Sequence, residues 1–402
     1  MSAAKEASGS PIEVFRAFLK LGMSCFGGPI AHLGYFRNEF VTRRKWLDEE
    51  AYADLVALAQ FLPGPASSQV GFSLGLLRAG YLGGLLAFIA FTLPSASLLV
   101  AFAYSAGALA GPLGAGLLHG LRLVAVAIVA QAVWGMARAL CPDRTRAAIG
   151  IGATLMVLAS TGAVAQVGAI VFGGLAGFLF CTSDTQPIMG HIPIPVSRRA
   201  GLVALGLFFF LMAALPFLRS LHLSPAIELF DAFYRAGALV FGGGHVVLPL
   251  LREAVVVPGW ISDGAFLAGY GAAQAVPGPL FTFSAYLGTI AKGPPNGLAG
   301  AMISLIAIFL PGLLVMTGTL PFWDSFRRRA KAQATMRGVN AAVVGLLGAA
   351  LYDPVWTTSV KSNGDFGLVL SCFILLVVWR LPPLVIVAVS ALGGMGLALF
   401  KM

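Results

Sequence analysis

Two stretches with the same core decide the fold of this chain: AQFLPGP at residues 59–65 and AQAVPGP at residues 273–279. Each lies inside an apolar run that would otherwise read as one membrane helix. Proline removes a hydrogen-bond donor and clashes with the preceding helical turn, and a glycine between two prolines permits a sharp change of direction. The sequence therefore predicts a broken helix at Pro63-Gly64-Pro65 and another at Pro277-Gly278-Pro279.

The residues around these two stretches repeat as well, which indicates an internal duplication. At an offset of 215 residues Phe26-Gly27-Gly28 corresponds to Phe241-Gly242-Gly243, and at an offset of 214 Trp46 corresponds to Trp260 and Gln60 to Gln274. We therefore expect two homologous halves joined by a linker that contains a connecting membrane helix. The expected bounds are 12–180 for the N-terminal repeat, 181–225 for the linker and 226–401 for the C-terminal repeat.

The composition places the chain in a membrane. Of its 402 residues 58% are hydrophobic and only 10% are charged, whereas a soluble domain carries about 25% charged residues. The apolar residues form long runs without strict alternation, which predicts an all-α polytopic membrane protein and not a β-barrel. The formal charge of +10 resides in short loops between these runs, where it is typical of membrane orientation and not of nucleic-acid binding.

The apolar runs predict about thirteen membrane segments when each broken segment is counted as one crossing. The two broken segments are 51–77 and 265–291, and the others are 12–36, 80–108, 117–140, 147–160, 163–180, 201–219, 226–250, 297–320, 336–352, 366–380 and 382–401. Seven crossings then separate equivalent points of the two halves. Because seven is odd, we expect inverted-topology repeats.

The loop charges agree with inversion in part. The loop near 142–147 is basic, whereas its counterpart near 353–365 has Lys361 as its only base. Conversely, the loop 327–331 is basic and its counterpart near 105–116 is uncharged. Opposite charge bias at equivalent loops is what inversion requires. The basic run 43–45 is an exception, because this topology places it on the outer face.

The helix that follows each break points to an anion site. Its first N–H groups lack partners within the helix and carry a partial positive charge, at Ser67 and Ser68 in one half and at Thr282 in the other. Two such termini near the midplane would suit a tetrahedral dianion. The alternative is that each Pro-Gly-Pro only bends its helix.

Other paired residues near the motifs are further candidates for binding the anion. Gln60 and Gln274 could donate to an anion or cap the broken backbone. The paired glycines, Gly27 with Gly28 and Gly242 with Gly243, could unwind a helix or only permit close packing. His32 and His245 could bear a proton or donate to the anion, or could be structural.

Charged residues inside the apolar runs complete the candidate set. Lys20 and Arg235 are equivalent bases about two turns into the first helix of each half, where they could bind an anion or extend to the interface. Asp54 is the only carboxylate shortly before a Pro-Gly-Pro, and Ala268 stands at its counterpart. Asp54 is therefore the candidate for coupling transport to protons.

The sequence offers no motif for catalysis, a metal or a cofactor. The four cysteines are scattered without a CxxC pair, and no Walker A, HExxH or dinucleotide-binding motif occurs. We therefore expect no enzyme activity, no cofactor and no metal.

The twofold pattern of FGG, a following histidine, Trp and Gln-x-x-Pro-Gly-Pro resembles the chromate ion transporter family in its long two-domain form. The resemblance runs from about residue 12 to about residue 400. The second half departs from the pattern, with Gly244 where the first half has Pro29 and with an earlier histidine. The family's motif positions correspond here to Phe26, Gly27, Gly28, Pro29, His32, Trp46, Gln60 and 63–65, and to Phe241, Gly242, Gly243, His245, Trp260, Gln274 and 277–279.

The resemblance implies a multi-pass protein of a prokaryotic inner membrane that exports chromate and confers chromate resistance, with its halves as inverted repeats. We expect a secondary transporter in which one half rocks against the other around a midplane oxyanion site, with sulfate as a related substrate. The alternatives are a passive anion channel and a transporter of sulfate or another oxyanion. The expected partners are the small oxyanion and the lipid bilayer, not nucleic acid; a homodimer is left open.

Overall fold

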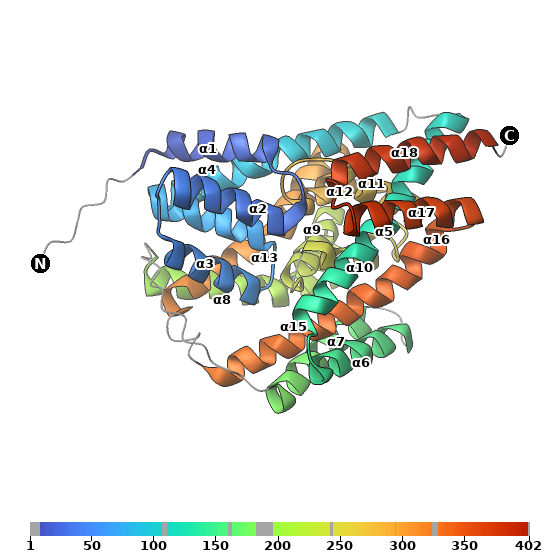
Figure 1. Cartoon of the computed structure of the whole chain (residues 1–402). Coiled ribbons are helices and arrows are strands. Elements are labelled where there is room, and N and C mark those ends of the chain that lie inside the picture. Colours follow the sequence, from blue (N-terminus) through green and yellow to red (C-terminus); the bar gives the residue numbers. More distant parts are fainter. Residues whose placement is uncertain are drawn as a thin grey trace, which may run out of the picture.

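Figure 1 shows a computed structural model of the chain. The structure describes residues 9–106, 111–159, 163–181, 196–241, 244–293, 295–323 and 329–400, and all regular secondary structure within these ranges is helical. An all-α membrane architecture is therefore confirmed. Five helical segments are long and apolar enough to cross a membrane: Ala66–Ser105, Pro112–Leu140, Arg198–Ser220, Gly297–Phe322 and Ala330–Ser359.

The helices of the first half, in chain order, are α1 (Pro11–Ser24), α2 (Gly28–Phe36), the π-helix η1 (Arg37–Arg43), α3 (Glu49–Phe61), α4 (Ala66–Ala106), α5 (Pro112–Leu140), α6 (Arg144–Ala159) and α7 (Ala163–Phe180). Helix α8 (Arg198–Ser220) follows them. Its exposed Phe209 and Phe210 would face lipid.

The helices of the second half follow a closely similar order. They are α9 (Pro225–Ala238), η2 (Gly244–Val246), α10 (Val247–Val255), α11 (Asp263–Ala273), η3 (Leu280–Thr282), α12 (Phe283–Ile290), α13 (Gly297–Thr319), η4 (Leu320–Phe322), α15 (Ala330–Ala350), η5 (Leu351–Trp356), α16 (Thr357–Ser359), α17 (Asn363–Val377) and α18 (Pro383–Phe400). Equivalent helices begin with equivalent caps: Asp48 caps α3, and Ser262, 214 residues later, caps α11.

The first two helices form a hairpin whose turn is the FGG motif. The ring of Phe18 in α1 lies 5.6 Å from that of Phe36 and 4.8 Å from that of Phe40, and Glu13 forms an ion pair with Arg44. Positions earlier in α1 thus contact positions later in the chain, which defines antiparallel helices. The turn needs glycine, because Gly27 and Gly28 have φ values of 101° and 78°.

The second Pro-Gly-Pro also lies at the turn of a helical hairpin. The Tyr286 hydroxyl donates to the carbonyl of Ala265, and the Phe283 ring contacts both Phe266 (5.2 Å) and Tyr270 (5.8 Å). Phe283 at the start of α12 reaches as far along α11 as Tyr270, whereas Tyr286, one turn later, contacts Ala265 near the start of α11. The two helices are therefore antiparallel, and the chain reverses direction at Pro277-Gly278-Pro279.

The first Pro-Gly-Pro turns the chain in the same way. Helix α3 is antiparallel to α2, because Tyr52 donates to the Leu33 carbonyl and Glu49 pairs with Arg37. The start of α4 is parallel to α2, because Ser67 contacts His32 and Gly71 lies against Phe36. Helix α3 and the start of α4 are consequently antiparallel.

Helix α4 itself reverses at Ala79 and Gly80, which have non-helical dihedral angles. A Cβ on Gly75 would lie 2.4 Å from the carbonyl oxygen of Gly83, so the parts before and after the kink pack tightly side by side. Residues 66–78, the first segment of α4, and 81–106, its second segment, are therefore two antiparallel helices. Figure 1 shows them as neighbouring light-blue and cyan helices.

These reversals differ from our expectation of a single crossing for each broken segment. The expected spans 12–36 and 226–250 also turn back, the former at FGG and the latter between α9 and α10. Periodicity and length predicted the apolar helices, but they carry no information on the direction of the chain after a break. Each half begins with two hairpins instead of two crossings.

The long helices of the two halves are exchanged in the packing. Helix α5 of the first half lies against α18 and α17, and the equivalent helix α15 lies against α7 and α6. Glycines make this close packing possible. A Cβ added to Gly120 would lie 2.2 Å from the carbonyl oxygen of Ser390, and a Cβ added to Gly338 would lie 2.0 Å from the carbonyl oxygen of Gly173.

One pair of equivalent helices, the second segment of α4 and α13, runs in opposite directions. The second segment of α4 is parallel to the hairpin arm containing α12, because Ser95 lies beside Gly278 and Phe102 stacks on Tyr286. Helix α12 is antiparallel to α13, since Gly288 and Gly300 lie against each other across the turn that joins them. The second segment of α4 and its repeat equivalent α13 are therefore antiparallel.

We predict that Gly338→Ala destabilises the protein, because the added methyl must displace backbone in a tightly packed helix contact. Such overpacking typically costs about 1–3 kcal/mol. The melting temperature in detergent measures the effect. It is read from the loss of the monodisperse size-exclusion peak after heating to increasing temperatures.

Gly135→Ala in α5 is the matched control, because no atom lies within 4 Å of a Cβ at that position. Alanine favours a helix over glycine by about 1 kcal/mol, so this variant should melt at the same temperature or higher. Equal destabilisation of both variants would contradict the exchanged helix packing.

Candidate functional site

The turns of the hairpins from both halves meet and are joined by two reciprocal hydrogen bonds. The backbone N–H of Gly64 donates to the carbonyl of Val240 (2.7 Å), and that of Gly278 donates to the carbonyl of Cys25 (2.9 Å). Cys25 and Val240 are equivalent residues immediately before the two FGG motifs. The two motifs of each half thus form one junction, in which each Pro-Gly-Pro binds the FGG turn of the other half.

The glycines of this junction, Gly64 and Gly278, cannot be replaced without strain. They have φ values of 118° and 97°, which other residues rarely adopt. A Cβ would also lie 2.8 Å from Gly312 Cα in the first case and 2.8 Å from Ser95 Oγ in the second. Gly312 and Ser95 each follow the in-helix prolines Pro311 and Pro94. The breaks therefore serve close backbone contact as well as chain reversal.

Buried polar side chains gather at the first Pro-Gly-Pro. His32 Nδ1 lies 3.4 Å from the Ser67 hydroxyl, and Ser68 and Gln69 follow on the first turn of α4. All four side chains are buried. The Gln69 amide donates to the carbonyls of Pro63 (2.8 Å) and Gly312 (3.0 Å), so it satisfies backbone groups exposed by the break.

Two polar groups of this cluster have no hydrogen-bond partner within the described residues. They are His32 Nε2 and the Ser68 hydroxyl. The first helical N–H that the structure shows bonded inside α4 is that of Gln69, which donates to Pro65. The N–H groups of residues 66–68 therefore remain at the positive end of the helix. The side-chain oxygen Oε1 of Gln69, an acceptor, also lacks a hydrogen-bond partner within the described residues.

The equivalent turn of the second half has different chemistry. Phe281 and Phe283 stand where the first half has Ser67 and Gln69. The hydroxyl of Thr282, the counterpart of Ser68, is already bonded to the Pro279 carbonyl (2.7 Å). The polar side chains of this half are His245 and Tyr270, and His245 Nδ1 lies 2.6 Å from the Tyr270 hydroxyl. Gln274 is half-buried next to Tyr270 and its amide nitrogen has no hydrogen-bond partner.

Three of the predicted anion ligands are not brought to the His32 cluster. Lys20 and Gln60 are exposed on α1 and α3. Arg235 pairs with the fully buried Asp231 (2.6 Å), which also binds Arg219 (3.3 Å). Arg235 is thus held by a buried carboxylate that it shares with Arg219, and the group of three keeps one net positive charge.

The remaining predicted residues are accounted for as follows. Gly27, Gly28 and the two Pro-Gly-Pro motifs, 63–65 and 277–279, form the junction. Asp54 is fully buried on α3, whereas Gly242 and Gly243 lie outside the described residues. Within the described residues, no group of three or more histidine, cysteine or acidic side chains is arranged to hold a metal ion.

Sequence reasoning missed Gln69 and Tyr270 as parts of the site. Gln69 could have been found from its place on the first turn after the break, but its contact with Gly312 spans 243 residues. Tyr270 gave no signal, because its repeat equivalent is Val56.

Comparison with known proteins adds a family to this geometry. The family described as chromate transporter matches the chain twice, over residues 12–178 and 227–395. The chromate transport protein of Pseudomonas aeruginosa is 29% identical over 87% of this chain and 82% of its own length.

Two further relatives show a similar level of identity. The probable chromate transport protein of Synechococcus elongatus is 31% identical over 83% of this chain and 82% of its own length. The chromate transport protein of Cupriavidus metallidurans is 26% identical over 82% and 79%, respectively. No solved structure matches the chain. Because the family matches both halves and most of the chain, this multi-pass membrane protein belongs to the chromate transporter family.

Proposed function

We propose that this chain is a secondary transporter that exports chromate from the cytoplasm across a prokaryotic inner membrane by alternating access. Sulfate, a related tetrahedral dianion, is a competing substrate. Support comes from the family, whose named relatives are chromate transport proteins. Membership of this family implies a transporter and not an enzyme.

The observation that carries this proposal is the set of unpartnered donors at the start of α4. Helix N–H groups of residues 66–68, the Ser68 hydroxyl and His32 Nε2 lie together in a buried site next to the junction. A helix N-terminus binds oxyanions through its N–H groups and its positive partial charge. The anion would supply the acceptors that these donors lack.

A site of this kind should not separate chromate sharply from sulfate. Helix N–H groups and a hydroxyl recognise charge and a tetrahedral set of oxygens, which both ions possess. The equivalent terminus of the second half offers apolar Leu280 and Phe281. We therefore place the anion at the first half's terminus and assign Gln274 and His245 to the wall of the site.

We also propose that the halves are inverted repeats with the bounds 12–180 and 226–401. The antiparallel course of α13 and the second segment of α4 supports this arrangement. If the hairpins enter and leave on one face, the crossings between equivalent points are the second segment of α4, α5, α6, α7 and α8. Five is odd, as inversion requires.

Loop charges support the same topology. With hairpins that return to their own face, the basic run 43–45 lies on the same side as 144–146, 198–199 and 327–331. The exception found from the sequence is thereby removed. The positive-inside rule makes this face cytoplasmic.

Asp54 is our candidate for coupling to protons, because it is a fully buried carboxylate on the helix that leads to the first break. A carboxylate in this position can bind and release a proton during a transport cycle.

We predict that Ser68→Ala weakens chromate transport without destabilising the fold. Replacing a buried hydroxyl that has no partner with a methyl group removes no protein hydrogen bond. Loss of a hydrogen bond to an anion should raise the apparent KM roughly 10- to 100-fold. Chromate flux into proteoliposomes and the melting temperature measure the two effects.

Ser73→Ala is the control for Ser68→Ala, because the Ser73 hydroxyl is buried and bonded to the Gln69 carbonyl within α4. It should leave the KM near that of the unmodified protein. An unchanged KM in Ser68→Ala would move the anion away from this terminus.

We predict that proteoliposomes accumulate chromate against its gradient when a pH gradient or a membrane potential is imposed. Sulfate added at increasing concentration should compete with chromate. Asp54→Asn should abolish the dependence on pH while leaving passive exchange. Flux that only dissipates the chromate gradient would identify a passive channel instead.

We predict that equivalent loops are accessible from opposite faces of the membrane. In a cysteine-free background, Pro142→Cys should react with an impermeant thiol reagent only after intact cells are permeabilised. Lys361→Cys, at the equivalent loop after α15, should react in intact cells. Reaction of both positions from the same face would rule out inversion.

A further inference from the structure

The end of each half that lies farthest from the junction carries an equivalent set of three residues. Glu13, Trp46 and Arg78 in the first half correspond to Glu228, Trp260 and Lys292 in the second, at the offsets of 215 and 214 that relate the repeats. Each set combines a carboxylate, an indole and a base from three separate segments of the chain. We call them the Arg78 cluster and the Lys292 cluster.

The Arg78 cluster is closed. Arg78 pairs with Glu13 (3.2 Å) and lies over the Trp46 ring, 5.4 Å from its centroid. Arg44 pairs with the same carboxylate (3.4 Å), and the backbone N–H of Gly9 donates to the Arg78 carbonyl. The cation–π contact and the ion pairs hold the three segments together.

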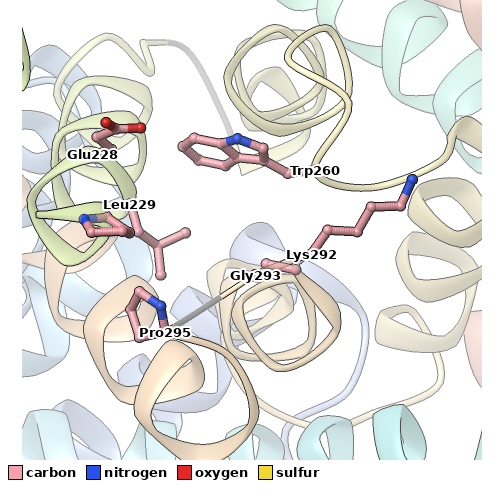
Figure 2. A pocket seen from close by; sticks show the side chains of 8 residues that line it. Glu228, Leu229, Trp260, Lys292, Gly293 and Pro295 are labelled. Carbon is pink, nitrogen blue, oxygen red and sulfur yellow. The ribbon is translucent and has the colours of Figure 1, made fainter. Parts of the chain in front are cut away.

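The Lys292 cluster is open. It lines a pocket between the start of α9, Trp260 and the segment after α12, with Ala291 and Pro295 in its wall. Figure 2 shows Trp260 between Glu228 and Lys292, with the ammonium group pointing away from the carboxylate. Lys292 forms no ion pair within the described residues, and Glu228 instead contacts His222 (3.3 Å).

Two continuous links connect the clusters through the junction. Glu13 lies on α1, whose last carbonyl at Cys25 accepts from Gly278, and the arm from Gly278 through α12 ends at Lys292. Arg78 ends the first segment of α4, which begins two residues after Gly64. Gly64 in turn donates to Val240 at the end of α9, the helix that carries Glu228. A movement that separates Glu13 from Arg78 therefore reaches both Lys292 and Glu228.

We propose that the pocket at Trp260 and Lys292 is an access site for the transported oxyanion, and that the Arg78 cluster is the equivalent site in its closed state. The two sites open in alternation. This inference rests on the proposed transport function. Lys292, which lacks an ion-pair partner in the open site, attracts the anion, and closure returns the base to its carboxylate. Equivalent elements with two discrete packings are what a two-state transporter needs.

Equivalent single cysteines test the alternation. Ala291→Cys lines the open pocket, and Leu77→Cys is its counterpart beside Arg78, both in a chain whose four native cysteines are replaced by alanine. The rate of reaction with a hydrophilic thiol reagent is measured in detergent, where both ends of the protein are accessible. Because Ala291 is buried and Leu77 is partly exposed in this structure, each rate is compared only with the rate at the same position in the variants below.

Glu13→Gln should then shift both rates in opposite directions. It should raise the rate at Leu77→Cys about two- to fivefold and lower the rate at Ala291→Cys. Loss of one partly exposed ion pair can change the ratio of the two conformations by about this factor. Arg78→Gln should do the same and serves if Glu13→Gln is not monodisperse. Glu49→Gln, which removes the exposed pair with Arg37, is the control and should change neither rate.

An increase at Leu77→Cys with no decrease at Ala291→Cys would show that the two clusters are independent and would overturn the proposal. Neither rate depends on which ion is carried. Failure of chromate transport with reciprocal labelling intact would therefore refute the proposed substrate and leave the alternation standing.

Discussion

Backbone hydrogen bonding inside the bilayer is the constraint on which the rest of this structure depends. Lipid offers no partners to exposed N–H and C=O groups, so a chain that turns within a membrane must satisfy them from protein. The Gly64–Val240 and Gly278–Cys25 bonds do this reciprocally, each turn serving the other half. A contact that is exchanged between two equivalent partners is the mark of twofold symmetry. The glycines, the duplicated motifs and the in-helix prolines all follow from the close approach that these two bonds require.

The symmetry of the backbone is not matched by the side chains. Ser67, Ser68 and Gln69 make the first terminus polar, and Leu280 and Phe281 make the second apolar. Asp54 has Ala268 as its counterpart, and Arg44 has Pro258. The proposed anion site therefore belongs to the first half alone, because the positive end of a helix is weak without side-chain donors around it.

The sequence predicted the helical class, the duplication and the positions of both breaks, because hydropathy, a fixed offset and proline chemistry are local signals. It did not predict that the chain reverses at Gly27, Gly64 and Gly80. A broken helix and a helical hairpin share the same residues, and only contacts such as Tyr286 with Ala265 distinguish them. Within the site, Ser67, Ser68 and His32 were expected from the sequence, but the pairing of Arg235 with the buried Asp231 depends on tertiary contacts that no motif encodes.

The exchange of long helices between the halves governs how the protein can be made. The Ser390 hydroxyl donates to the carbonyl of Gly120, a contact that spans 270 residues. The glycine face of α5 therefore stays uncovered until nearly the whole chain has been synthesised and inserted. Non-local contacts of this kind slow folding and leave surfaces open to wrong partners in the meantime. The final packing of the first half therefore waits until α18 has been synthesised and inserted.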